Sequence, residues 1–119
     1  MPVWTWPGAV ITRVIDGDSL IARLTRDIGF NGVVTFDQRL RLNRINAAPR
    51  GTELGQRARA FVILWLDGQV LSIDTVKPYK YGDEWMAEVF GTNGGNLSDA
   101  LVGTGHAVYW DGTGPRPGG

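Results

Sequence analysis

Two aspartates, Asp16 and Asp18, flank a glycine in the segment VIDGDSL, residues 14–20. Residues two apart in a strand point to the same side, so the two carboxylates face one way if this segment is extended. Carboxylate oxygens are the ligands that calcium collects in proteins. The same Asp-Gly pair is also a common hairpin turn. The spacing leaves both interpretations open, and the turn alone is the more common of the two.

A second candidate site is the segment RLRLNRINAAPR, residues 39–50, which carries four arginines and no acid. These are Arg39, Arg41, Arg44 and Arg50. Arg41 alternates with leucines and therefore belongs to the polar face of a strand, where a guanidinium can bind phosphate through two hydrogen bonds. A solvated strand face is the alternative. Asn46 offers an amide oxygen, a weaker calcium ligand than a carboxylate.

The segment KPYKYGDEW, residues 77–85, interleaves cations with aromatic rings, namely Lys77, Tyr79, Lys80 and Tyr81. This mixture suits phosphates with stacked bases, and it also suits an exposed hairpin loop. We predict nucleic-acid contacts at Lys77, Lys80 and Tyr81, and also at Arg44 and Arg50. Two tryptophans near the N-terminus, Trp4 and Trp6, are candidates for contact with a partner.

The composition excludes several classes of protein. The 119 residues fit one domain, and the absence of cysteine excludes disulfides and thiolate metal sites. Twelve basic and twelve acidic residues cancel, so the net charge of the chain gives no indication of nucleic-acid binding. No apolar run approaches the roughly 20 residues that span a bilayer, and the N-terminus lacks the pattern of a signal peptide. We expect a cytoplasmic or virion-associated protein that does not enter a membrane.

The elements that must position these residues follow from the hydrophobic pattern. Three strands come first, then a helix between Thr52 as N-cap and Gly68 as stop, two more strands, and a short helix capped by Asn96. The expected strands cover residues 9–15, 19–25, 33–45, 69–76 and 84–90, and the second helix covers 97–105. Gly29 to Gly32 reads as a loop.

The predicted fold is mainly β with α, an α+β five-stranded Greek-key barrel of the oligonucleotide/oligosaccharide-binding (OB) type with two attached helices. A ferredoxin-like sandwich would need an early helix, which the pattern lacks. Leu20, Ala22 and Leu24 share one face of a strand. The inner face of the first helix is expected to hold Leu54, Ala58, Phe61, Val62 and Trp65. Residues 1–110 form the domain, and 111–119 are expected to be a flexible Gly/Pro tail.

Five fragments in this order resemble the staphylococcal-nuclease-like (thermonuclease) family. They are VIDGDSL, RLRLNRINAAP, QRARAF, KPYKYGDEWMAEV and NLSDALVGTGHAVYW, and together they cover about residues 9–110. Their joint order and spacing carry the resemblance, since no single fragment is specific. The chain looks most similar to compact versions found in phages and other mobile elements. The resemblance implies the same five-stranded barrel.

The family hydrolyses DNA and RNA phosphodiesters with calcium, and the resemblance implies roles for several residues here. Asp18 falls on a metal ligand, and Asp16 supports that site. Arg41 falls on the arginine that contacts the phosphate. Asn46 stands where the family has a calcium-binding aspartate, and Ala47 stands where a backbone carbonyl binds the metal. The loss of one carboxylate implies weak calcium binding.

Two further family groups have no match. The glutamate that activates the attacking water is replaced in NAAPRG by Ala48 or Pro49, and Asp83 stands where a Y-G-R arginine stabilises the transition state. A positioned base is commonly worth about 10²–10⁴ in rate, and charge stabilisation is worth as much or more. Hydrolysis is therefore predicted to be weak or lost. Glu53 is a candidate replacement base, and Arg44 or Arg50 is a candidate replacement cation.

Three functions remain open from the sequence. The first is a weak calcium-dependent endonuclease with Arg41 and Glu53 as catalytic residues. The second is a non-catalytic relative whose barrel binds single-stranded DNA or RNA, or a protein. The third is a phage or assembly component that forms a homo-oligomer and uses its two ends as docking arms, because function does not follow from fold.

Overall fold

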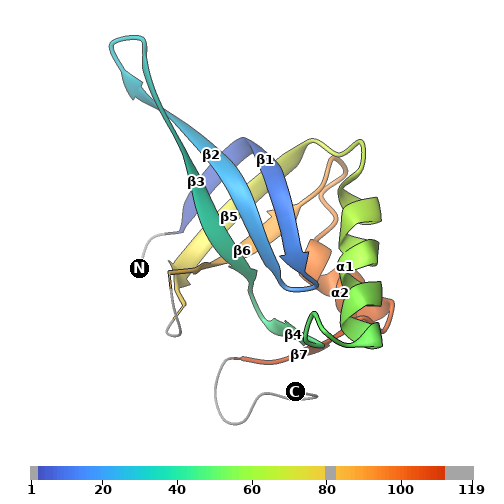
Figure 1. Ribbon diagram of the computed structural model, residues 1–119. Helices are drawn as coiled ribbons and strands as arrows, with labels where there is room; N and C mark the ends of the chain where they lie inside the picture. The colour runs from blue at the N-terminus through green and yellow to red at the C-terminus, as the bar shows by residue number, and fades with distance from the viewer. Residues whose placement is uncertain (1–2, 80–82, 112–119) are drawn as a thin grey trace.

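Five strands of the computed structural model close into a barrel (Figure 1). The structure describes residues 3–79 and 83–111. The strands are β1 (Trp4–Asp16), β2 (Ser19–Gly29), β3 (Gly32–Leu42), β5 (Leu71–Pro78) and β6 (Trp85–Phe90). Their order around the barrel is β1-β2-β3-β6-β5, with only β3 and β6 parallel. The predicted class, a mostly β barrel of the OB type with helices, is confirmed.

Two helices and a small second sheet complete the described fold. Helix α1 (Glu53–Leu66) and helix α2 (Leu97–Gly103) cover one end of the barrel (Figure 1). Strands β4 (Ile45–Ala47) and β7 (Ala107–Tyr109) pair antiparallel. The sequence pattern missed this pair, because it read residues 33–45 as one strand. The chain turns after Leu42, and Arg44 has a left-handed φ of 70° there.

The predicted helix caps are confirmed. The side chain of Thr52 accepts a hydrogen bond from the amide of Gly55, and the side chain of Asn96 accepts one from the amide of Asp99. Each bond satisfies an amide that the first helical turn leaves unpaired. Helix α1 ends at Leu66, and Gly68 follows with a φ of 71°.

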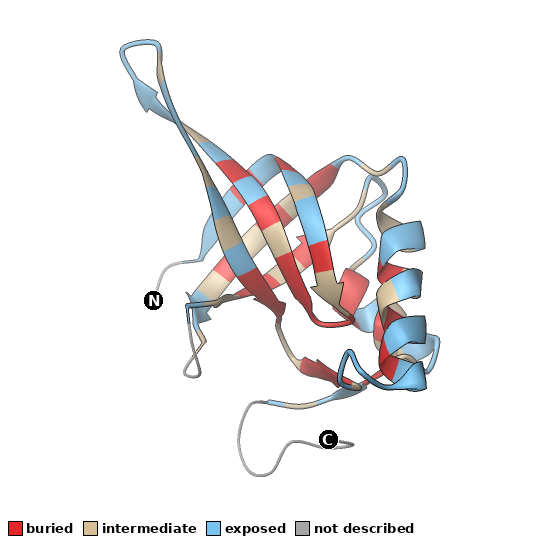
Figure 2. Cartoon of the chain, in the orientation of Figure 1, coloured by how far each residue is buried: buried red, intermediate tan, exposed pale blue. Residues whose placement is uncertain are grey.

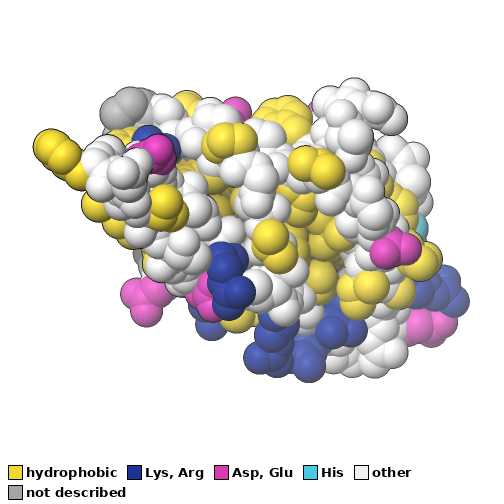
Figure 3. All heavy atoms as spheres, turned by 90° about the horizontal axis from the view of Figure 1, so that it is seen from above, with side chains coloured by type: hydrophobic (Ala, Val, Ile, Leu, Met, Phe, Trp, Pro, Cys, Tyr) yellow, Lys and Arg dark blue, Asp and Glu magenta, His cyan; other side chains and the backbone are white. Residues whose placement is uncertain are grey.

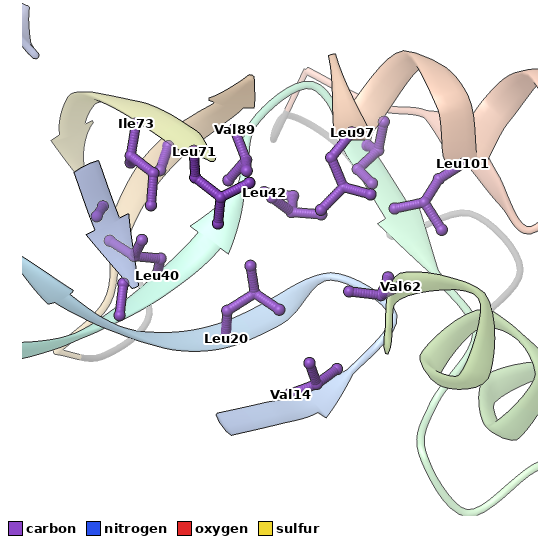
Figure 4. Close-up of a cluster of buried hydrophobic side chains, with 14 of the residues drawn as sticks. Val14, Leu20, Leu40, Leu42, Val62, Leu71, Ile73, Val89, Leu97 and Leu101 are labelled. Carbon is purple, nitrogen blue, oxygen red and sulfur yellow. The ribbon is translucent and has the colours of Figure 1, made fainter. Parts of the chain in front are cut away.

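The core lies inside the barrel and beneath the two helices (Figure 2). Leu20, Ala22 and Leu24 are fully buried, as their alternation along the strand predicts. Figure 4 shows barrel side chains and the helix residues Val62 and Leu101 in one cluster. Ala58 and Val62 are buried on α1 as predicted, and Phe61 and Trp65 pack against the core while partly exposed. The prediction for Leu54 was wrong, because Leu54 is exposed.

The β1–β2 turn is fixed by contact with helix α1. A Cβ atom on Gly17 would lie 2.6 Å from the Cβ of Ala58 and 2.9 Å from the Cβ of Ala47. Only glycine allows α1 and β4 to approach the turn this closely. The Asp-Gly pair therefore makes the predicted turn, and the close packing around Gly17 holds the backbone from which Asp18 projects.

Strands β2 and β3 extend beyond the barrel as a long hairpin, here called the arm, residues 25–35 (Figure 1). The predicted loop at 29–32 is a tight turn in which Phe30 and Asn31 have φ angles of 53° and 59°. Two consecutive left-handed residues are the geometry of a type I′ hairpin turn. Because both flanking strands continue past the barrel, the arm projects away from it.

Candidate functional site

Three of the predicted site residues converge on one buried cluster at an end of the barrel. Asp18 precedes β2, Arg41 lies near the end of β3, and Asn46 lies in β4. Arg41 Nη1 lies 3.2 Å from Asp18 Oδ2, and Arg41 Nη2 donates to Asn46 Oδ1 at 3.0 Å. The relative exposure of all three residues is 3–4%. The predicted meeting of hairpin acid and strand guanidinium is present in the structure.

Strand register explains why these side chains meet. Arg41 pairs with Ser19 across the β2–β3 ladder, and the amide of Leu42 donates to the carbonyl of Asp18 at 2.8 Å. The guanidinium lies 4.9 Å from the centre of the Tyr79 ring and 5.8 Å from the Trp110 ring. Aromatic faces attract cations at such distances. Arg41 is therefore buried although it lies on the face of β3 that alternation assigns to solvent.

Asp16 and Ala47 hold the Asp18 carboxyl in place. The backbone amide of Ala47 donates to Asp18 Oδ2 at 2.9 Å, and Asp16 Oδ1 accepts from the amide of Asp18 at 3.1 Å. An aspartate that binds the amide two residues on stabilises a turn by itself. Asp16 therefore supports the cluster by fixing the turn.

Burial dominates the electrostatics of the cluster. The pKa of the Asp18 carboxyl is raised to about 7, first by burial and second by a hydrogen bond with Asp16. The charge of Arg41 and the amide of Ala47 act in the opposite direction without cancelling the effect of burial. Near neutral pH the carboxyl thus exists in both forms, and Arg41 is only partly neutralised by it.

The cluster opens into a pocket of about 440 Å³. Its lining comprises Asp16, Asp18, Ser19, Arg39, Arg41, Tyr79 and Glu84. Ser19 Oγ donates to Glu84 Oε2 at 2.7 Å, which links the first residue of β2 to the residue before β6 within the lining. The sequence reading did not assign Glu84 to the site. The parallel pairing of β3 with β6 in a barrel of this type is the signal that places Glu84 beside the Arg39–Arg41 segment.

One polar atom in the cluster has no partner. Arg41 Nε is buried and has no hydrogen-bond acceptor among the described residues, while both Nη atoms are engaged. Buried donors without acceptors are rare in folded proteins and call for an explanation, such as a bound ligand. Asp18 and Asn46 thus fix the orientation of the guanidinium through its Nη atoms, and Nε is left without an acceptor from the described residues.

As arranged, the residues implied as calcium ligands do not fit that ion. Calcium needs six to eight oxygen ligands. Asp18 Oδ2 already accepts from Arg41 and Ala47, and Asn46 Oδ1 already accepts from Arg41. Within residues 3–79 and 83–111, no three His, Asp or Glu side chains are grouped closely enough to hold a metal ion. The guanidinium sits beside the oxygens that a cation would need.

The candidate replacement groups lie elsewhere. Glu53 is exposed at the start of α1 and forms an ion pair with Arg57 one turn later at 2.6 Å, outside the pocket lining. Arg50 is exposed in the turn before α1 and does not line the pocket either. Asp83 is also exposed, and its backbone carbonyl accepts from the side chain of Gln38. The positions of Glu53 and Arg50 therefore give no support to their predicted roles as replacement base and replacement cation.

Arg44 is part of a separate network that joins secondary-structure elements. Its guanidinium contacts Glu88 at 2.7 Å and Asp99 at 2.9 Å, and Asn96 at 3.4 Å. These acids raise the pKa of Arg44, and Arg44 in turn lowers the pKa of Asp99. The turn before β4 is thereby tied to β6 and α2. Arg44 has its donors on structural acceptors, which argues against the predicted contact with nucleic acid.

Of the predicted aromatic and cationic loop, only part is described. Lys77 is exposed and lines a second pocket beside Trp85. Lys80 and Tyr81 lie outside the described residues, as does most of the predicted tail, 112–119. Among the described residues no helix is long and apolar enough to cross a membrane. Compared with family models and with curated proteins, the sequence matches none.

Proposed function

We propose that this chain is a staphylococcal-nuclease-like barrel that binds the phosphodiester backbone of single-stranded DNA or RNA in the Arg41 pocket and hydrolyses it weakly or not at all. The observation that carries the proposal is the buried Arg41 guanidinium, which lines a pocket and keeps Nε without a partner. The sequence resemblance assigns the same arginine to phosphate contact.

The surroundings of Arg41 favour an anionic ligand with a base attached. A phosphate oxygen that accepts from a guanidinium forms a charge-assisted hydrogen bond, which is stronger than a neutral one. Arg39 adds a second cation to the lining, and the ring of Tyr79 adds a surface on which a base can stack. Protonation of Asp18 leaves the charge of Arg41 available, so binding is expected to strengthen below pH 7.

The same pocket offers little to hydrolysis. A general base must lie within hydrogen-bond reach of the attacking water, directly or through one more water. The acids of the lining are engaged elsewhere, since Glu84 accepts from Ser19 and Asp16 from the turn amide. Glu53 points to Arg57. We therefore expect binding without efficient turnover.

Fluorescence anisotropy with a labelled single-stranded oligonucleotide tests the binding step. The variant Arg39→Ala is expected to weaken binding, because it removes an exposed cation from the pocket without disturbing the buried pair. Arg23→Ala is the matched control, since Arg23 is also exposed and pairs with Asp37 away from the pocket. Each lost phosphate contact should reduce the salt slope by about 0.7. Absence of binding by the wild type at low salt contradicts the proposal.

A cleavage assay on the same oligonucleotide tests the second half of the proposal. Incubation in millimolar calcium is expected to leave the substrate mostly intact over the time in which binding equilibrates. Rapid cleavage that EDTA abolishes would mean that a catalytic group enters the pocket from elsewhere. In that case the assignment of a lost activity is wrong, although the Arg41 pocket would remain the binding site.

A further inference from the structure

The arm exposes large apolar side chains to solvent. Ile28, Phe30, Val33 and Val34 are all exposed, and Phe30 fully so. Seen from above, hydrophobic side chains stand out at the left of the molecule, where the arm lies (Figure 3). Exposed apolar side chains gathered in one part of a surface are typical of sites of protein association.

The backbone of the arm is also open to a partner. The β1–β2 ladder ends at the pair Val10–Arg23, and β3 pairs with β6 only over Leu40–Leu42. Within the described residues, 3–79 and 83–111, no further strand therefore pairs with the two outer edges of the arm. Edge strands that carry apolar side chains are prone to associate with another chain.

The same molecule carries an apolar pocket of about 410 Å³. Three tryptophans, Trp4, Trp6 and Trp85, line it together with Pro78, and Lys77 lies at its margin. Trp4 and Trp6 stack on each other, and Arg26 covers their rings at 4.2 and 4.5 Å. The pocket is thus preformed and held open by packed rings, which suits the insertion of one aromatic side chain.

The arm and this pocket lie on the same side of the barrel. Both are on the side away from helices α1 and α2, where the arm projects at one end and the start of β1 and the end of β5 meet at the other (Figure 1). Two copies that face each other through this side, related by a two-fold axis, have an arm and a pocket from each copy at their interface. Closed two-fold pairs of this kind are the commonest oligomers.

We propose that the occupant of the tryptophan pocket is Phe30 of a second copy of this chain, inserted reciprocally in a two-fold dimer. The charges agree with this pairing, because Asp27 lies beside the tip of the arm and Lys77 at the margin of the pocket. The formal net charge of zero leaves no general repulsion between copies. The inference is independent of the phosphate pocket, which is lined by other residues.

Sedimentation over a concentration series tests the dimer. The wild type is expected to be a dimer, and Phe30→Ser and Trp4→Ser are each expected to weaken association at least tenfold. Both positions are exposed, so neither change removes a core residue. Leu64→Ser is the matched control, because Leu64 is an equally apolar exposed residue on α1, away from the arm. It should leave the dimer intact.

Mixing the two variants gives the sharper result. A pair of Phe30→Ser and Trp4→Ser chains contains one intact arm and one intact pocket, whereas each variant with itself contains no intact contact. The mixture should therefore associate more tightly than either variant alone. A wild type that stays monomeric overturns the proposal. So does a Trp4→Ser variant that dimerises normally, since the arms would then pair edge to edge, or a pocket found to bind a nucleobase in a monomer.

Discussion

Arg41 and Arg44 lie three residues apart in the same segment, and the structure uses them in different ways. The Arg41 side chain is 5% exposed and pairs with one carboxylate, that of Asp18. The Arg44 side chain is 41% exposed and pairs with two, those of Glu88 and Asp99. Arg41 retains an unpartnered Nε, whereas Arg44 also reaches Asn96. The more deeply buried guanidinium, that of Arg41, thus has fewer acceptors than the more exposed guanidinium of Arg44.

The number of acceptors around a guanidinium separates a structural arginine from one that is ready for a ligand. Arg44 has two carboxylates and an amide, and its removal breaks contacts between elements. Arg41 has one donor, Nε, for which the described residues offer no acceptor. The difference predicts that variants at the two positions will affect stability and binding separately.

The largest effect is expected for Arg41→Met at pH 8. Removing one partner of a buried ion pair typically costs about 3–5 kcal/mol, because the other charge is left uncompensated. Here the stranded group is the Asp18 carboxylate, 4% exposed. Urea denaturation at pH 8 and pH 6 measures the cost. It should be smaller at pH 6, because protonation neutralises the stranded carboxyl. An equal cost at both pH values would mean that Asp18 is not the group left uncompensated.

The second largest effect is expected in the pH dependence of the free energy of unfolding, and its cause is the Asp18 carboxyl. Since the pKa of Asp18 is raised to about 7 in the folded state, the folded protein binds more protons than the unfolded chain between about pH 4 and 7. The stability that this carboxyl contributes is fully present below the unfolded pKa and is lost as the pH rises through 7. Relative to Asp18→Asn, the wild type should lose stability over this window. A parallel pH profile for the two proteins would contradict the raised pKa.

The barrel was predictable because its signals are local. The alternation in β2 predicts that Leu20, Ala22 and Leu24 lie on the buried face. Thr52 and Asn96 predict where the two helices begin, because their side chains are typical N-caps. The meeting of Asp18 and Arg41 could also be predicted, since Asp18 directly precedes β2, Arg41 lies near the end of β3, and the two strands are antiparallel neighbours.

The partners of each arginine were not predictable, because they depend on contacts distant in sequence. Arg44 meets Glu88 and Asp99, which are 44 and 55 residues away. In the fragment RLRLNR, nothing distinguishes the roles of Arg41 and Arg44. The backbone turns at Arg44, which has a left-handed φ, and Arg41 contacts Asp18 whereas Arg44 contacts Glu88 and Asp99. Glu53 pairs with Arg57 one turn along α1 and does not line the pocket, so its role as a replacement base stays a prediction.

A smaller effect is expected for Arg44→Met. The side chain is partly exposed, so solvent screens its ion pairs, and the loss of the hydrogen bonds to Glu88 should cost about 1–2 kcal/mol. Urea denaturation measures this cost. Oligonucleotide affinity at constant salt should change less than twofold, in contrast to Arg39→Ala. A marked loss of affinity in a folded Arg44→Met protein would place Arg44 at the ligand after all.

The smallest effect is expected for Glu53→Gln. Glu53 is exposed on the first turn of α1 and pairs with Arg57 at i,i+4, an arrangement worth about 0.3–0.5 kcal/mol. Neither oligonucleotide binding nor any residual calcium-dependent cleavage should change, because Glu53 does not line the Arg41 pocket. Glu53→Gln therefore separates two accounts of any slow cleavage that the wild type displays. If the change abolishes that cleavage while the melting temperature stays constant, Glu53 must reach the pocket when substrate binds, and the separation of the helix from the Arg41 site does not hold.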